Sequence, residues 1–345
     1  MLETLKLRNF TVFEEAEFHF APGLNVLVGE NGTGKTHVLK VAYSAIASTP
    51  SGIPTPPSKS QRESRLADKL LGVFKPDKLG HLVRHDPNIK RCEVECKFSN
   101  SNFDLGFSFS IISNGDVDLQ QIPLEIQVAR SVFLPARELL SIFPKFASLY
   151  ETRYLPFEET WRDTCLYLDA PLLRDIRQVK IRELLSALEL ALGGTVELDR
   201  TGGFYLQTPD GRREIHLVAE GHRKLAMLAQ LIANGSLSSG NYLFWDEPEA
   251  NLNPHIIKLA AKVILQLSKI GIQIIAASHS LFLLRELDIL LQTQEFKSVP
   301  ARFFGLHSTG AGVQVQQGPT IDDIGEITSL QEELSQSDRY LESEA

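Results

Sequence analysis

Cysteine, long apolar runs and an excess of basic charge are all scarce in this 345-residue sequence. Its three cysteines, an odd and small number, fit a reducing cytoplasm and argue against a disulfide-based fold. No stretch has the apolar length of a membrane span, and the N-terminus shows no signal-peptide pattern. We therefore expect a cytoplasmic protein without membrane contact.

The net charge and the cysteine spacing argue against two further classes of protein. A net charge of −8 argues against a surface built wholly for nucleic acid, although it leaves room for a local basic patch. Cys92 and Cys96 lie in an alternating strand pattern without a matching His or Cys pair, which favours buried thiols over a zinc site. With 43% hydrophobic residues, the chain can bury a substantial core, as one large domain or two modest ones.

The most informative stretch covers residues 29–36 and fits the phosphate-binding pattern G-x-x-x-x-G-K-[ST], the Walker A motif, at every fixed position. An apolar strand at 24–28 precedes it, and apolar residues at helical spacing follow it. Strand, glycine loop and helix together favour a phosphate cradle over a chance glycine-rich turn. Lys35 is expected to reach the β- and γ-phosphates of ATP, and the Thr36 hydroxyl to bind Mg²⁺. The residues assigned to ATP binding are Glu30, Asn31, Gly32, Thr33, Gly34, Lys35, Thr36 and His37.

Two polar strand ends form the second landmark. The apolar run 242–245 ends in Asp246 and Glu247, and carboxylates there are costly unless a cation or a proton engages them. We expect Asp246 to lie in the metal shell and Glu247 to act as general base on the attacking water. A second apolar strand ends in Ser278-His279-Ser280, where His279 is placed to hydrogen-bond the γ-phosphate. The alternatives are an acidic turn after a core strand and a surface histidine.

Periodicity predicts the elements around these motifs. Residues 1–20 alternate as two strands, and residues 91–98 and 103–111 alternate as an antiparallel meander with one solvent-exposed face. After a strand at 131–134, the pattern predicts a helix carrying Arg137 and Glu138, and the best helix covers residues 171–192. A hairpin follows at 196–206, and a helix opens at 219–224. Residues 48–59, rich in Ser, Thr and Pro, are predicted to form a mobile loop.

This order of motifs, with Trp-Asp-Glu-Pro-Glu at 245–249, resembles the ABC-class ATPases. It is most similar to the branch with SMC-like proteins, RecF recombination mediators and OLD-family ATPases, and within it to stand-alone AAA-family ATPases of bacterial defence or toxin–antitoxin-like loci. The resemblance implies an α/β P-loop NTPase of ABC-ATPase type, with a mixed central sheet, an antiparallel β lobe and a helical lobe. It implies one domain over 1–345: the P-loop core and β lobe at 1–135, the helical lobe at 136–194, and the signature-like helix, Walker B strand, His switch and C-terminal helix at 195–345.

The resemblance also implies an ATP-dependent homodimer, in which Gly221 of one subunit faces the γ-phosphate held by the other. Ala219 stands where transporter-type signatures have a serine, so catalysis would depend on the Gly221 amide, the helix dipole and Arg223 or Lys224. The alternative for these two cations is a solvated helix face. No clear match to the family's glutamine loop is present, and Glu138 or Arg137 occupies its place in chain order.

Three functions compete at this stage. The first is an ATP-hydrolysing switch, with Glu247, Lys35 and His279 as catalytic residues, that regulates a separate effector protein, as in antiphage defence. The second is a RecF- or SMC-like repair ATPase that binds DNA, for which the Lys and Arg residues between 58 and 91 are the candidate patch. The third, a scaffold that holds ATP without hydrolysis, is disfavoured by the intact Glu247.

Overall fold

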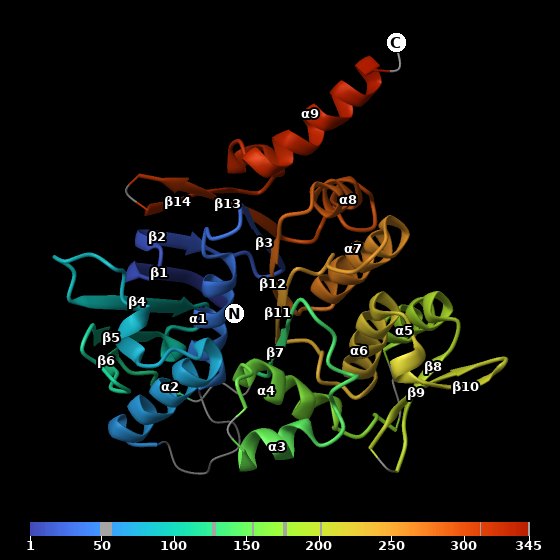
Figure 1. The fold of residues 1–345 in the computed structure, drawn as a ribbon, viewed down its shortest axis with the longest axis horizontal. Helices are drawn as coiled ribbons and strands as arrows, with labels where there is room; N and C mark the ends of the chain where they lie inside the picture. The colour runs from blue at the N-terminus through green and yellow to red at the C-terminus, as the bar shows by residue number, and fades with distance from the viewer. Residues whose placement is uncertain are drawn as a thin grey trace.

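The computed structural model describes residues 1–48, 57–125, 129–153, 155–174, 178–200, 202–310 and 312–343. Figure 1 shows a central sheet, a second sheet on its left in blue to cyan, and helices below and to the right. Residues 49–56 of the predicted loop lie outside the described residues. None of the helices in the described ranges combines the length and apolar character that crossing a membrane requires.

The central sheet has six strands in the order β14-β13-β3-β12-β11-β7. All neighbours from β13 to β7 are parallel, whereas β14 is antiparallel to β13, so the predicted mixed sheet is confirmed. Strands β3 and β12 are buried along their whole length, as parallel strands covered on both faces must be. The strands are β3 (Leu24–Gly29), β7 (Ser131–Leu134), β11 (Tyr242–Asp246), β12 (Gln273–Ser278), β13 (Ala301–Thr309) and β14 (Gly312–Gly318).

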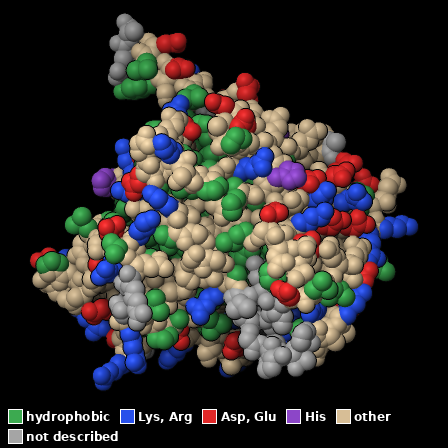
Figure 2. All heavy atoms as spheres, turned by 180° about the vertical axis from the view of Figure 1, so that it is seen from behind, with side chains coloured by type: hydrophobic (Ala, Val, Ile, Leu, Met, Phe, Trp, Pro, Cys, Tyr) green, Lys and Arg blue, Asp and Glu red, His purple; other side chains and the backbone are tan. Residues whose placement is uncertain are grey.

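The second sheet is antiparallel and has the order β2-β1-β4-β5-β6. The predicted antiparallel meander over residues 91–111 is confirmed by the pairing of β4 with β5. Its strands are β1 (Leu2–Phe10), β2 (Phe13–His19), β4 (Arg91–Phe98), β5 (Leu105–Ser110) and β6 (Asp118–Gln121). The outer face of β1, β2 and β4 carries paired charges, including Lys6 with Glu17 and Arg8 with Glu15 and Glu93. Figure 2 shows acidic and basic side chains interleaved toward the upper right of the view.

Helices cover both faces of the central sheet. Helix α1 (Lys35–Ala47) lies between the two sheets and shares one hydrophobic cluster with them. Helices α6 (Glu220–Ala233), α7 (Pro254–Lys269) and α8 (Leu281–Leu291) pack on the opposite face in a second cluster. Alternate residues of β11 serve the two clusters, because successive side chains of a strand point to opposite faces.

Chain 136–217 forms the lower and right-hand part of Figure 1. It contains α3 (Phe146–Thr152), α4 (Glu159–Leu168), α5 (Val179–Leu192) and a small sheet of β8 (Thr195–Leu198), β9 (Phe204–Thr208) and β10 (Gly211–Glu214), followed by the 3-10 turn Ile215–Leu217. The predicted hairpin is confirmed, since Val196 pairs with Leu206.

Two predicted helices in this region need correction. Residues 136–145 form bends and turns, because the Glu138 carboxylate accepts a hydrogen bond from the Ser141 amide and an ion pair from Arg223. Such a side-chain contact offers the backbone an alternative to helix. The helix expected over 171–192 begins only at Val179, and upstream of it the Leu173 amide bonds instead to the Ala233 carbonyl.

The remaining elements lie at the edges of the fold. Helix α2 (Lys59–Phe74) begins directly after Ser58, which forms a capping box with Gln61. Helix α9 (Thr328–Ser343) projects from the body at the top of Figure 1. Short 3-10 turns lie at Leu79–Leu82, Ser101–Phe103 and Ile321–Ile324.

Candidate nucleotide site

The glycine-rich loop joins the end of β3 to the start of α1, as its pattern requires. Gly32 and Gly34 both have left-handed backbone angles, with φ of 85° and 87°. A Cβ atom on Gly34 would lie 2.7 Å from Val12 and 2.8 Å from the Phe13 ring, so only glycine fits there. The first amides of α1 have no acceptor inside the helix and are therefore free for an anion.

Lys35 is buried in this loop and folds back onto it. Its Nζ donates hydrogen bonds to the carbonyls of Gly29 at 2.7 Å and Glu30 at 2.9 Å. Burial lowers the pKa of Lys35, and the nearby Asp246 carboxylate opposes that shift. The loop carbonyls thus hold the ammonium beside the acidic strand end, in the place where a bound phosphate would compete for it.

Thr36 and Asp246, which are 210 residues apart in sequence, meet directly. The Thr36 hydroxyl donates to the Asp246 carboxylate, with oxygen separations of 2.9 and 3.1 Å. Burial raises the pKa of Asp246 to about 6, although the hydrogen bond from Thr36 opposes the rise. A hydroxyl and a buried, poorly compensated carboxylate match the oxygen ligands that Mg²⁺ prefers, so these residues fit the metal that ATP requires.

Glu247 adopts a backbone conformation that is unusual for a glutamate, with φ of 47°. Its amide donates to the Ala277 carbonyl at 2.9 Å, and its carbonyl accepts from the Ala250 amide at 3.0 Å. The Glu247 Oε1 atom lies 3.5 Å from Nδ1 of His279. Both side chains stay accessible, with 35% and 46% of their surface exposed, so water can reach the carboxylate.

Glu249 is a member of this site that the sequence did not assign. Its Oε1 atom accepts hydrogen bonds from the Ser278 hydroxyl at 2.7 Å and from the His279 amide at 3.1 Å. The side chain is 7% exposed. Glu249 therefore ties the acidic turn to the loop that carries His279. A third carboxylate close behind the acidic pair was the available signal, but spacing alone does not reveal burial.

The other predicted phosphate-loop residues divide into two groups. Glu30, Asn31 and Gly32 are exposed, whereas Thr33 is buried with its hydroxyl on the Glu30 carbonyl. The His37 ring packs 5.7 Å from the Phe74 ring, away from the loop. Burial, helped by the charge of Lys40, lowers the pKa of His37 to about 4. A neutral ring turned to the core leaves only the His37 amide for a phosphate.

The start of α6 packs against the acidic turn of its own chain. A Cβ atom on Gly221 would lie 2.9 Å from the Asn251 carbonyl, so this glycine is required by close packing. The solvated-face alternative for the next two cations is wrong. Arg223 donates to Glu138 at 2.8 Å, and Lys224 donates to the carbonyls of Glu247 at 2.7 Å and Ala250 at 3.2 Å.

The pairing with Arg223 also bears on Glu138, one of the two candidates for the missing glutamine loop. The Glu138 side chain is only 3% exposed and is engaged by Arg223 and the Ser141 amide. Its carboxylate is therefore committed to holding the loop after β7 against α6. Arg137, the next residue upstream, is exposed.

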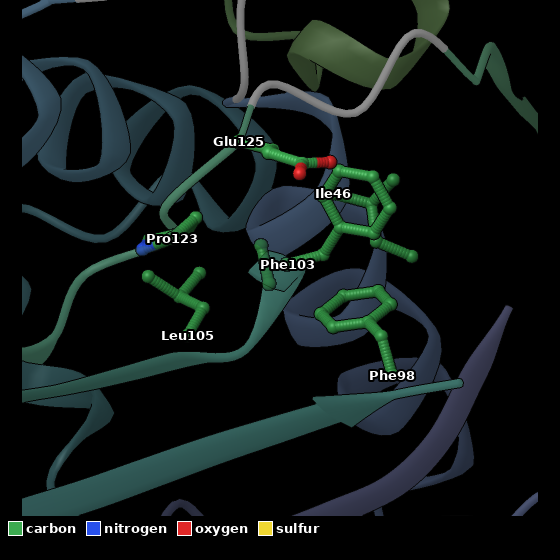
Figure 3. A pocket seen from close by; sticks show the side chains of 7 residues that line it. Ile46, Phe98, Phe103, Leu105, Pro123 and Glu125 are labelled. Carbon is green, nitrogen blue, oxygen red and sulfur yellow. The ribbon is translucent and has the colours of Figure 1, made fainter. Parts of the chain in front are cut away.

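A small hollow at the other end of α1 is no nucleotide site. Figure 3 shows it between Ile46, Phe98 and Phe103, with the Glu125 carboxylate at its edge. Its cavity volume is about 10 Å³, which is near the minimum for one water molecule. The side chain of Glu125 is engaged by Asn102 at 2.7 Å.

Two family models match the chain. The model described as "AAA domain, putative AbiEii toxin, Type IV TA system" matches residues 135–285, and one described as "AAA domain" matches residues 4–126. Among solved structures, the SMC head domain from Thermotoga maritima covers 91% of this chain and 97% of its own length, at 13% identity and a TM-score of 0.52. An Smc head bound to the C-winged helix domain of ScpA covers 93% and 98%, at 15% identity and a TM-score of 0.59.

Curated relatives match only over short stretches. The DNA replication and repair protein RecF of Salinibacter ruber is 49% identical over 43 residues, which is 12% of this chain and 10% of that protein. RecF of Listeria monocytogenes serotype 4b is 49% identical over 90 residues, or 26% of this chain and 21% of that protein. The matched part is therefore a tenth to a fifth of these relatives' length.

A glycine loop on a parallel sheet, with the Thr36–Asp246 contact at its strand ends, defines a P-loop nucleotide-binding protein. The second sheet and the inserted helices give the chain the fold of SMC head domains. Two AAA-domain models and short stretches of RecF match it, which supports an ATPase of the SMC and RecF type.

Proposed function

We propose that this chain binds and hydrolyses Mg·ATP as a molecular switch that closes into a homodimer and regulates a separate effector protein. The observation that carries the proposal is the meeting of Thr36 with Asp246 beside Lys35, with Glu247 next in the chain. Phosphate binding, metal coordination and a base for water thus converge at the same strand ends.

Each side chain has a role that its position supports. The loop amides and Lys35 bind the phosphates, and Thr36 and Asp246 hold Mg²⁺, which neutralises charge on the phosphate oxygens when bound. Glu247 accepts a proton from water as it attacks the γ-phosphorus, and the bond to the leaving ADP oxygen breaks. His279, 3.5 Å from Glu247, orients that carboxylate and contacts the γ-phosphate.

Dimerisation would complete the site from the other subunit. In the proposed homodimer, the start of α6 at Ala219–Gly221 presents its amides and helix dipole to the partner's γ-phosphate. Gly221 itself is buried against the Asn251 carbonyl of its own chain. Closure would require ATP, because the γ-phosphate supplies the charge that the helix start recognises.

The test uses Glu247→Gln, with Glu15→Gln as control because Glu15 is 76% exposed on the outer face of β2. We expect Glu247→Gln to bind Mg·ATP normally, to lose about 10²-fold or more in turnover, and to form a stable dimer by light scattering. Hydrolysis at the wild-type rate would show that Glu247 is not the base. Absence of an ATP-dependent dimer would refute the proposed homodimer.

The proposal also includes a separate effector protein and a biological role. The family model whose description names an AbiEii toxin and a Type IV TA system supports a role in a bacterial defence locus. Capture of the trapped Glu247→Gln dimer from the native host, compared with Lys35→Ala, is expected to enrich one protein in an ATP-dependent way. Equal recovery of proteins with both variants would argue against an effector.

DNA binding is the alternative, favoured by the short RecF matches. The candidate basic patch is partly neutralised: Lys59 and Arg91 pair with Asp118, and Lys69 pairs with Glu159 and Asp163. Gel shifts over a salt series decide this point, because phosphate contacts give a steep salt dependence. Steep, ATP-dependent DNA binding would favour the alternative.

A further inference from the structure

Lys224 is buried at the junction between α6 and the turn that follows β11. Its residue exposure is 2%, although lysine is rarely buried without a carboxylate partner. The two acceptors of its ammonium are backbone carbonyls, those of Glu247 at 2.7 Å and Ala250 at 3.2 Å. A charge buried on carbonyls alone needs a reason beyond packing.

The turn that Lys224 holds carries the general base in a strained conformation. Glu247 has φ of 47° and Asn251 has φ of 63°, which side chains other than glycine adopt infrequently. The surrounding contacts must therefore enforce this backbone. Ala277 fixes the Glu247 amide, and Lys224 fixes the Glu247 carbonyl, so both sides of this residue are clamped.

Other contacts of α6 fasten the same turn. Glu220 accepts a hydrogen bond from the Asn251 side chain at 3.0 Å, and Gly221 packs against the Asn251 carbonyl. The first turn and a half of α6 and residues 247–251 thus form one unit. Lys224 is the member of that unit that reaches the backbone of Glu247 itself.

We propose that Lys224 is a positioning residue for ATP hydrolysis: its ammonium holds the Glu247–Ala250 turn so that the Glu247 carboxylate faces the attacking water. This inference rests on the proposed function. In this role Lys224 acts through the carbonyls of Glu247 and Ala250 and takes no direct part in the chemistry. Burial lowers the pKa of Lys224, and the charges of Glu249, Glu247, Glu220 and Asp246 oppose that shift.

The position of Lys224 also couples the start of α6 to the turn that carries Glu247. In the proposed homodimer the start of α6 meets the partner's γ-phosphate, whereas Glu247 acts on the nucleotide of its own subunit. Because Lys224 joins the helix to the Glu247 turn, binding of the partner's nucleotide would help to set the local base. This link lies wholly within one chain.

The experiment compares Lys224→Met with wild type and with Lys258→Met, a control on the exposed side of α7. We expect Lys224→Met to keep ATP affinity and KM within about threefold and to lower kcat by about tenfold or more, since a small misplacement of a catalytic group is costly. Lys224→Arg, which retains donors, is expected to recover part of kcat. If Lys224→Met does not fold by circular dichroism, Lys224→Gln is judged by the same criteria.

A double-variant cycle separates positioning from general damage. In single-turnover assays, adding Lys224→Met to Glu247→Gln is expected to cause no further loss, because the lysine acts through that carboxylate. Full additivity of the two losses, or unchanged kcat in the single variant, would overturn the inference while leaving the proposed function intact. A wild-type protein without ATP turnover would overturn both.

Discussion

Asp246→Asn should make the nucleotide-free protein more stable at neutral pH, although it removes the proposed metal ligand. The Asp246 pKa rises from 3.8 to about 6, chiefly through burial. A rise of this size means that keeping the carboxylate ionised costs the fold about 3 kcal/mol at pH 7. The amide of Asn removes the charge but keeps an oxygen that can accept from Thr36.

The sign of the pH dependence follows from the raised pKa. Below pH 3.8 the carboxyl is protonated in both the folded and unfolded states, so the gain from Asn is near zero. Wild type loses stability relative to Asp246→Asn as pH rises through about 6, and the difference levels off above that. Urea unfolding with a chelator and without nucleotide, at steps from pH 4 to pH 8, measures the difference in unfolding free energy.

Two controls sharpen this test. Asp118→Asn, which removes an exposed carboxylate paired with Arg91, is expected to change stability by less than about 1 kcal/mol. Saturating Mg·ATP should stabilise wild type more than Asp246→Asn, because only wild type keeps the metal ligand. The reasoning would be refuted if Asp246→Asn is no more stable than wild type at pH 7. It would also be refuted if the difference in unfolding free energy does not change with pH.

Three further predictions follow from other sites. Gly34→Ala should abolish ATP binding in a fluorescence titration, because its Cβ would strike Phe13 at 2.8 Å, whereas Gly32→Ala has open space and should retain weaker binding; equal losses would contradict the steric argument. Tyr43→Phe should lower the unfolding free energy by about 2 kcal/mol, since the buried Tyr43 hydroxyl donates to Asp163 at 2.6 Å. Although burial acts to raise it, the pKa of Asp163 lies below its ordinary value because of Lys69, Arg162 and that hydroxyl, so acid unfolding of Tyr43→Phe should begin at higher pH; an unchanged acid limb would show that the bond is unimportant. The thiols of Cys92, Cys96 and Cys165 should react with Ellman's reagent only on unfolding, because burial raises the pKa of each to about 12. Fast reaction of the native protein would contradict their burial.

The parts of the fold and site that the sequence predicted are those written in local patterns. The strand that ends in Asp246 and the loop that ends in Lys35-Thr36 can each be predicted from a few neighbouring residues. Parallel strands bring their carboxyl ends to one edge of a sheet, so the meeting of Thr36 and Asp246 followed from two local predictions. The alternation in β4 likewise placed Cys92 and Cys96 inside.

The errors arose where one tertiary contact outweighs the local pattern. The residues around Glu138 have helical propensity, but its carboxylate is engaged by Arg223, 85 positions later in the chain. A solvated helix face was the alternative for Arg223 and Lys224, because charged residues usually lie outside, whereas the loop after β7 and the turn after β11 cover that side of α6. Neither contact leaves a trace in periodicity.

These two neighbouring cations give α6 its place in the site. Successive helix residues point about 100° apart, so Arg223 reaches Glu138 after β7 while Lys224 reaches the Glu247 carbonyl after β11. Strands β7 and β11 are adjacent and parallel, and their ends border the same edge of the sheet as the glycine loop. A force applied at the start of α6 therefore reaches two adjacent strand ends through two short side-chain bonds. For an ATPase whose partner subunit engages that helix start, this is the physical route by which closure could set the geometry of the water-activating carboxylate.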